Sequence, residues 1–309
     1  MQFGDFEWLC SQVPSYTWCN LFYNQLQRVD PSLLVGLSSD SKSAPVGVDP
    51  TCGTLRVGQG GSLGNISNIV VCAVSMLVTM GLIYMTGRRK AAVGRVEFRF
   101  LLVLYLLTLP FQLLTTGSLL EQGTTPLVIL TAVHAGLVAA FFWALLANAI
   151  VATQIVEDGT LASIIPFLIF TIAFFAATLY IGLDVGIGFT SALGPSNNPR
   201  ELRSIPLFVL TSIWPAASAL FYFALMTYIV LGVLNEVKPM WSYIIAAVFF
   251  VLAQLAWLLL GKVICRGTNA KIDGSFVATI LETAAIVALY IGWKGITEES
   301  WDDNGYNYR

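Results

Sequence analysis

Two ionisable side chains lie well inside apolar stretches of the sequence and are the first candidates for chemistry. His134 is the one histidine of the chain, and Glu282 is the one carboxylate placed deep in such a stretch. An ionisable residue inside a membrane span is costly to bury and often marks a proton or cation site. The alternative is structural, with a neutral imidazole and a protonated carboxyl hydrogen-bonded between helices. We favour the structural interpretation for both, with Gln112, Asn148 or Gln254 as partners for Glu282.

The sequence lacks the residue patterns of the common catalytic centres. A catalytic zinc site takes about three protein ligands, often histidines, and a single histidine cannot supply them. Gly58–Gly61 is not followed by the Lys-Ser/Thr of a phosphate-binding loop, and there is no Gly-x-Ser-x-Gly elbow. A net charge of −2 without a long basic run argues against nucleic acid as a partner. We therefore predict a protein that is not an enzyme and holds no cofactor or metal.

Four of the five cysteines are predicted to form disulfides. Cys10, Cys19 and Cys52 precede the first apolar stretch, Cys265 follows the sixth, and Cys72 lies inside the first. If the N-terminus is outside the cytosol, the four share one oxidising compartment, where two bonds allow three connectivities. One of these bonds would tie the N-terminal region to the sixth loop, for example through Cys52 and Cys265.

Membrane-spanning helices must position these residues. Hydrophobic residues make up 56% of the chain and charged residues 11%, whereas a soluble domain carries roughly 25% charged residues. Seven charge-poor stretches reach or approach the ~20 residues that cross a bilayer core: Ile66–Met85, Phe100–Gly117, Pro126–Thr153, Leu161–Leu183, Leu207–Leu234, Met240–Gly261 and Ser275–Trp293. The expected fold is an all-α membrane protein. A seven-transmembrane-helix bundle (65–293) follows a small, loop-rich N-terminal lumenal region (1–64) and precedes a short acidic cytosolic tail (294–309).

The loop after the first helix decides the predicted orientation. Arg88, Arg89, Lys90 and Arg95 concentrate positive charge there, and loops of this kind stay on the cytosolic side. A lumenal N-terminus follows, and seven crossings then leave the C-terminus in the cytosol.

The third apolar stretch carries a small or amide residue at every fourth position, a spacing that lets helix backbones approach closely. The positions are Ala132, Gly136, Ala140, Ala144, Asn148 and Ala152. This face either docks another membrane protein or packs against neighbouring helices of the same bundle, and we give the second more weight. Two acidic segments are further candidates for contact with a partner, the Glu157-Asp158 turn and the tail with Glu298 and Glu299.

Several short segments, spread from the first ten residues to the last twenty, form an ordered pattern. They are Phe3-Gly4-Asp5-Phe6 with Cys10 and Cys19, Val46 to Cys52, Ala92 to Glu97, Trp143 to Asn148 leading to Glu157-Asp158-Gly159-Thr160, Ile264-Cys265 with Ile272-Asp273-Gly274, and Trp293 to Trp301. Together they resemble the fungal chitin synthase export chaperones. The resemblance implies a multi-pass protein of the endoplasmic-reticulum membrane, surrounded by membrane lipids. Its client would be a polytopic chitin synthase, which it helps to fold and to leave for the cell surface in support of cell-wall chitin synthesis. It implies no covalent chemistry.

Two other classes are compatible with seven spans. A seven-helix receptor fits the crossing number, but a retinal-type receptor needs a lysine inside the last helix, where Glu282 stands and Lys294 only follows. A small-solute or proton-coupled transporter would use Glu282 and His134, but the chain shows no internal repeat. The tail carries neither a dilysine nor a Lys-Asp-Glu-Leu retrieval signal, so the protein is expected to travel with its client.

Overall fold

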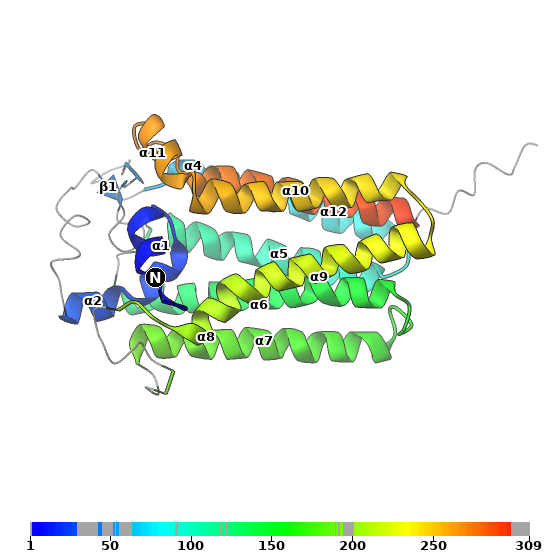
Figure 1. The fold of residues 1–309 in the computed structure, drawn as a ribbon, viewed down its shortest axis with the longest axis horizontal. Helices are drawn as coiled ribbons and strands as arrows, with labels where there is room; N and C mark the ends of the chain where they lie inside the picture. Colours follow the sequence, from blue (N-terminus) through cyan, green and yellow to red (C-terminus); the bar gives the residue numbers. More distant parts are fainter. Residues whose placement is uncertain are drawn as a thin grey trace, which may run out of the picture.

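Seven long apolar helices form the body of the computed structural model (Figure 1). The structure describes residues 2–29, 43–44, 52, 54–55, 64–89, 92–117, 119–120, 123–188, 190, 192–193 and 201–297. The spans are α4 (Ile66–Arg88), α5 (Arg95–Thr116), α6 (Thr125–Ala152), α7 (Leu161–Ile187), a fifth span (Ile205–Val233), α10 (Lys238–Leu258) and α12 (Gly274–Thr297). The predicted all-α fold of seven spans is confirmed, and α12 continues past its predicted end at Trp293.

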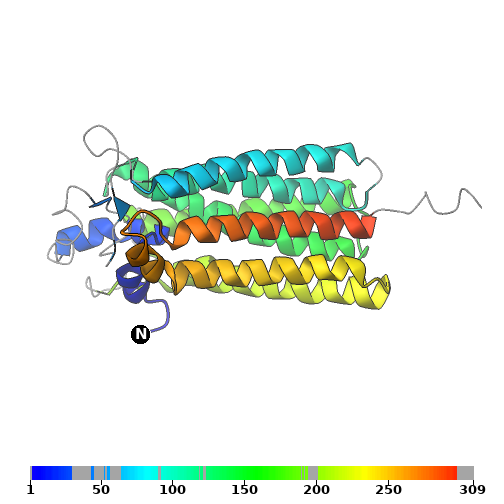
Figure 2. The same ribbon diagram turned by 90° about the horizontal axis from the view of Figure 1, so that it is seen from above.

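The two ends of the bundle differ (Figure 1). One end, here the capped end, carries α1 (Glu7–Gln12), η1 (Thr17–Leu21), α2 (Tyr23–Val29), α11 (Gly261–Gly267) and the antiparallel pair β1 (Ser43–Ala44) and β2 (Thr54–Leu55). The other, here the far end, carries the α4–α5 and α6–α7 turns. Seen from above, α12 runs between α4 and α10 (Figure 2).

α6 is the most buried span because of its small side chains. Of its most apolar window 72% is buried, against 22% in α7 and in α10. Alanines and one glycine on its buried faces let α5, α7 and α9 pack closely against it. A Cβ added at Gly136 would lie 2.9 Å from the carbonyl oxygen of Phe175 on α7. Larger residues on these faces would therefore force the neighbouring helices apart.

The fifth span is irregular along its length. It consists of α8 (Ile205–Phe208), the π-helical turn η4 (Val209–Ile213), α9 (Trp214–Thr227) and a second π-helical turn, η5 (Tyr228–Val233). Pro215 follows the first π-helical turn, and proline has no N–H to continue a regular helix. Figure 1 shows α9 approaching α10 toward the far end and separating from it toward α8.

The first part of the N-terminal region belongs to the core of the bundle. All five residues of η1 are buried, and η1 contacts α5, α6 and α7. Phe6, Phe22 and Leu26 join Val128 of α6 and Val185 of α7 in one hydrophobic cluster. We had expected a small, loop-rich region here. In the structure, residues 7–29 form two short α-helices and a 3-10 helix, because their apolar side chains are buried against the spans.

Candidate functional site

His134 is buried in α6, next to the N-terminal segment. Its Nδ1 lies 3.3 Å from the hydroxyl oxygen of Thr115, and its ring centroid lies 5.3 Å from that of Trp18. The Asn20 amide donates to the Thr115 carbonyl oxygen at 3.2 Å and to the Thr131 hydroxyl at 3.5 Å. In the described part of the chain, no group of three or more His, Cys, Asp or Glu side chains could hold a metal ion. The imidazole is therefore placed to hold η1 against α5 and α6.

Glu282 lies partly buried in α12 and makes no hydrogen bond to another described residue. Gln112 instead donates to the Thr279 hydroxyl at 2.7 Å, and Asn148 donates to the Ala144 carbonyl oxygen at 2.8 Å. The expected pairing of Glu282 with Gln112 or Asn148 is thus not found, because each amide bonds to another acceptor close to it.

A hydrogen-bonded seam joins α4, α5 and α12 within the span region. The Thr279 hydroxyl donates to Asn68 Oδ1 at 3.2 Å, and the Thr283 hydroxyl donates to Ser75 Oγ at 2.7 Å. The Tyr105 hydroxyl lies 2.8 Å from that of Thr283. Sequence reasoning missed this seam, although threonines one turn apart in α12 are the signal that could have found it. Such bonds satisfy polar groups away from water and fix the register of the three helices.

A second polar cluster lies at the capped end, around the fully buried Asp273. Its carboxylate accepts hydrogen bonds from Ser15 Oγ, from Asn65 Nδ2 at 3.2 Å, from Ser275 Oγ at 2.6 Å and from the Phe276 N–H at 3.3 Å. Burial raises the pKa of the Asp273 carboxyl above its ordinary value of 3.8, although the bonds from Ser275, Phe276 and Asn65 act to lower it. The cluster ties the α1–η1 loop to the first turns of α4 and α12.

The structure pairs the four cysteines into two disulfides. Cys10 is bonded to Cys19 with their Cα atoms 5.6 Å apart, and Cys52 is bonded to Cys265 with their Cα atoms 6.3 Å apart. Cys72 is a buried free thiol. Of the three connectivities that the sequence left open, the structure therefore has the one that includes the Cys52–Cys265 bond. This bond fastens residue 52 of the N-terminal region to α11.

At the far end, Glu97 holds the α6–α7 turn in place. Its side chain is fully buried, and Oε1 accepts from the Gly159 N–H at 2.9 Å and from Ser163 Oγ at 2.6 Å. Its other oxygen, Oε2, is buried and has no hydrogen-bond partner among the residues that the structure describes. From the sequence, Glu97 entered only as the last residue of the segment Ala92 to Glu97 that carries the family resemblance, and its role in holding the turn was missed.

The small-residue face of α6 lies inside the bundle. Ala140 and Ala144 are buried, and Gly136 lies against Phe175 of α7. Asn148 Nδ2 also donates to the Glu97 carbonyl oxygen at 3.3 Å. In this structure these positions are occupied by contacts within the chain, which is the alternative that we favoured from the sequence.

The acidic candidates for partner contact divide into an engaged and an exposed group. Asp158 Oδ2 accepts from the Gly94 N–H at 2.7 Å, so this carboxylate joins the two far-end turns. The neighbouring Glu157 is exposed. Glu298 and Glu299 lie outside the described residues. Of the acidic residues proposed from the sequence, the described part of the chain therefore presents Glu157 to a partner.

The comparisons with known proteins agree with one another. The family model described as chitin synthase export chaperone matches residues 2–305. A chitin synthase export chaperone of Chaetomium globosum is 27% identical over 302 residues, covering 97% of this chain and 84% of the relative. One of Phaeosphaeria nodorum is 27% identical over 301 residues, covering 97% and 83%. One of Cryptococcus neoformans is 25% identical over 254 residues, covering 82% and 69%. No solved structure matches the chain.

Proposed function

The chain belongs to the chitin synthase export chaperone family, and from this premise we propose that it assists folding of a chitin synthase and its export from the endoplasmic reticulum. The observation that carries the proposal is the family match, which extends over residues 2–305 and so includes both ends of the bundle. The client is a membrane protein, and the contact we propose is between helices within the bilayer. No covalent step is required.

The use of the interior polar residues favours a chaperone over a transporter. His134 supports the N-terminal segment, and threonines of α12 bond to α4 and α5. A transporter needs polar groups that exchange partners with a moving solute, whereas these groups hold helices of the same chain together. Glu282 is the interior ionisable group to which this argument does not extend.

We propose that the capped end faces the lumen and the far end the cytosol. The disulfide-bonded cysteines lie at the capped end, which suits an oxidising compartment. The basic residues Arg88, Arg89 and Arg95 lie at the far end, which suits the cytosolic side. A glycosylation reporter fused to each terminus tests this orientation, and a glycosylated C-terminal reporter would contradict it.

Contacts outside the bilayer would then be cytosolic. We propose that the exposed Glu157 and the acidic tail with Glu298 and Glu299 contact basic segments of the client. Exposed ion pairs contribute roughly 0–1 kcal/mol each, so these contacts supplement the helix contacts and do not replace them.

Deletion of the gene in a strain with a fluorescent chitin synthase tests the function. The expected result is a synthase retained in the endoplasmic reticulum and a lower chitin content of the wall. Complementation with Glu282→Gln or His134→Ala, at confirmed abundance, is expected to restore export because neither residue acts as a catalyst in this proposal. Normal arrival of the synthase at the surface in the deletion strain, with unchanged wall chitin, would refute the chaperone function.

A further inference from the structure

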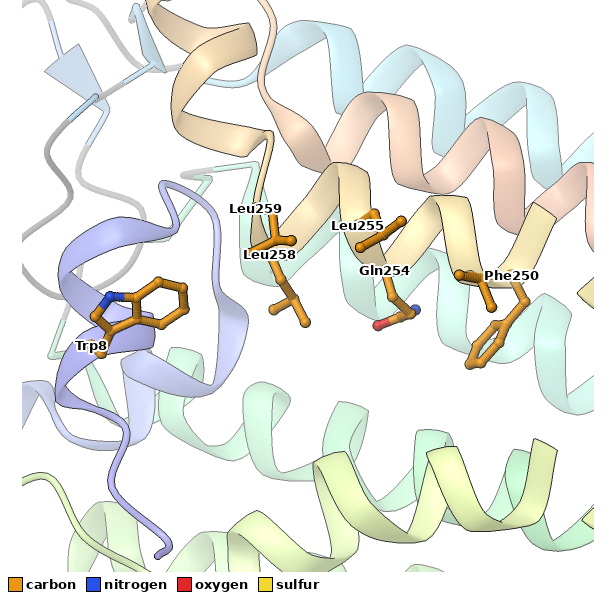
Figure 3. Close-up of a pocket in the computed structure, with 7 residues that line it drawn as sticks. Trp8, Phe250, Gln254, Leu255, Leu258 and Leu259 are labelled. Atoms are coloured by element: carbon orange, nitrogen blue, oxygen red, sulfur yellow. The ribbon is translucent and has the colours of Figure 1, made fainter. Parts of the chain in front are cut away.

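A groove runs along α10 at the capped end of the bundle (Figure 3). It has a volume of about 340 Å³ and is lined by Trp8 of α1, by one face of α10 and by the residue that follows α10: Phe250, Val251, Gln254, Leu255, Leu258 and Leu259. Figure 3 shows Phe250, Gln254 and Leu258 projecting from the same side of α10, with the indole of Trp8 at the end next to Leu258 and Leu259. The groove therefore begins near the end of the span and extends toward its middle.

Among the residues that the structure describes, the irregular fifth span does not cover this groove. Near the far end α9 and α10 are close, with the ring centroids of Tyr222 and Tyr243 6.3 Å apart. Toward the capped end the two helices separate (Figure 1). Val251, Leu255 and Leu259 are exposed there, to the bilayer in a membrane protein.

The dimensions of the groove fit the side chains of one helix face. From Phe250 to Leu259 it follows the last residues of α10 and the one after them, nine steps of 1.5 Å or about 13.5 Å in all. That length corresponds to about two turns of a neighbouring helix at 5.4 Å per turn. An occupying helix would thus lie alongside α10 and insert side chains at i, i+3, i+4 and i+7 spacing.

Gln254 distinguishes a helix from a lipid chain as the occupant. The groove is otherwise lined by apolar side chains, and the Gln254 carboxamide makes no hydrogen bond to another described residue. A primary amide in hydrocarbon gains from a partner that both donates and accepts. An acyl chain offers neither, whereas a serine, threonine, asparagine or glutamine on a transmembrane helix offers both. An open amide in an apolar groove therefore selects a helix with one polar side chain.

We propose that this groove, formed by Trp8 and residues 250–259, docks a transmembrane helix of the client whose apolar face carries one hydroxyl or amide side chain. The inference rests on the proposed function, since it takes the client to be the chitin synthase. The polar side chain would hydrogen-bond Gln254 while its apolar neighbours pack between Leu255, Leu258 and Trp8. Until the client helix packs within the folded synthase, its polar side chain has no hydrogen-bond partner in the lipid, which is unfavourable. Binding in the groove would supply that partner during folding.

Site-specific photo-crosslinking in fungal membranes tests the groove. The full-length protein carries p-benzoyl-phenylalanine at Leu255, within the groove, or at Leu77, which is exposed on α4 and separated from α10 by α12. The expected result is an adduct with the chitin synthase from position 255 and none from position 77. If the probe at position 255 forms adducts with lipid and none with protein, the groove holds lipid and the inference is overturned.

The two levels of the proposal fail in different ways. Adducts with the synthase from Leu77 and not from Leu255, or co-purification of the synthase without an adduct from Leu255, would leave the chaperone function standing and refute the groove. A synthase that neither co-purifies nor depends on this protein for export would refute the function itself.

Two substitutions separate the hydrogen bond from the shape of the groove. Gln254→Leu removes the amide, and an interhelical hydrogen bond of average strength corresponds to about a threefold fall in co-purified synthase. Val251→Leu changes the same lining without removing a polar group and is the matched control. Leu255→Trp fills the groove and is expected to abolish the crosslink from a probe at Leu258, whereas Leu77→Trp leaves it unchanged. Each variant is first shown to elute as a folded species in mild detergent. Equal amounts of synthase co-purified with Gln254→Leu and with the parent protein would refute the role of the amide.

Discussion

Replacing Glu97 by alanine should loosen the far end of the bundle. The side chain is fully buried and accepts two hydrogen bonds, one from the Gly159 N–H and one from Ser163 Oγ. Alanine removes the acceptor from the N–H of the exposed Gly159 and from the buried Ser163 hydroxyl, which keeps only its longer bond to the Thr160 carbonyl oxygen at 3.2 Å. The far-end turn between α6 and α7 then loses one of its attachments to α5.

The size of the effect follows from the Ser163 hydroxyl, because Ser163 is buried whereas Gly159 is exposed. Leaving a buried donor without a partner costs about 1–3 kcal/mol, so we expect a loss of about 2 kcal/mol. At about 2–4 °C per kcal/mol, the unfolding temperature should fall by roughly 4–8 °C. Glu97→Gln keeps an acceptor oxygen and should lose less than half of this.

The assay is the fraction of protein that stays monodisperse after heating in mild detergent. Glu157→Ala is the matched control, because Glu157 is an exposed carboxylate next to the same turn. An unfolding temperature for Glu97→Ala within about 2 °C of the parent, or an equal fall in the Glu157→Ala control, would refute the reasoning.

Three further predictions come from other parts of the fold. Gly136→Ala should destabilise by about 1–3 kcal/mol, because the new Cβ would lie 2.9 Å from the Phe175 backbone, whereas Gly81→Ala meets nothing within 4 Å and should be neutral in the same thermal assay. The sequon at Asn65 should remain unglycosylated, because its amide is buried and bonded to Asp273; a glycosidase-sensitive mobility shift that Asn65→Gln removes would contradict this. Burial raises the pKa of Asp273, so the folded state binds this proton more tightly than the unfolded state, and the associated stability is lost as pH rises through the raised pKa. Unfolding temperatures should therefore fall with rising pH more steeply in the parent than in Asp273→Asn, and identical pH profiles would count against the assignment.

The number of spans and their approximate limits were accessible from the sequence because they depend on local composition. A run of about 20 apolar residues can be identified as a membrane span from its own composition, whatever the other segments of the chain do. The predicted stretch Leu161–Leu183 and the observed α7, Leu161–Ile187, begin at the same residue. Where the limits differ, as at the end of α12, the helix continues past Trp293, whose indole donates to the Val93 carbonyl oxygen at 3.0 Å. That contact is made between parts of the chain far apart in sequence.

The environment of each apolar face was not accessible in the same way. Lipid tails and a packed helix interface are similarly apolar, so hydrophobicity does not tell a buried face from a lipid-facing one. α6 and α7 are both apolar spans, yet 72% of one window and 22% of the other are buried. The alanine and glycine spacing in α6 indicated close packing, but only the tertiary structure identified α7 as the partner at Gly136.

The sequence by itself determined that this is a seven-helix membrane protein with four cysteines able to pair and few interior ionisable groups. The tertiary structure decided which cysteines pair, that η1 is buried beside His134, and that Glu97 holds a turn more than 60 positions away, at Gly159. It also decided that α9 and α10 separate and leave Gln254 in an open groove. The physical reason is the range of the interactions. Partition into a bilayer is a property of one segment, whereas a hydrogen bond, a disulfide or a groove exists only when distant segments are brought together.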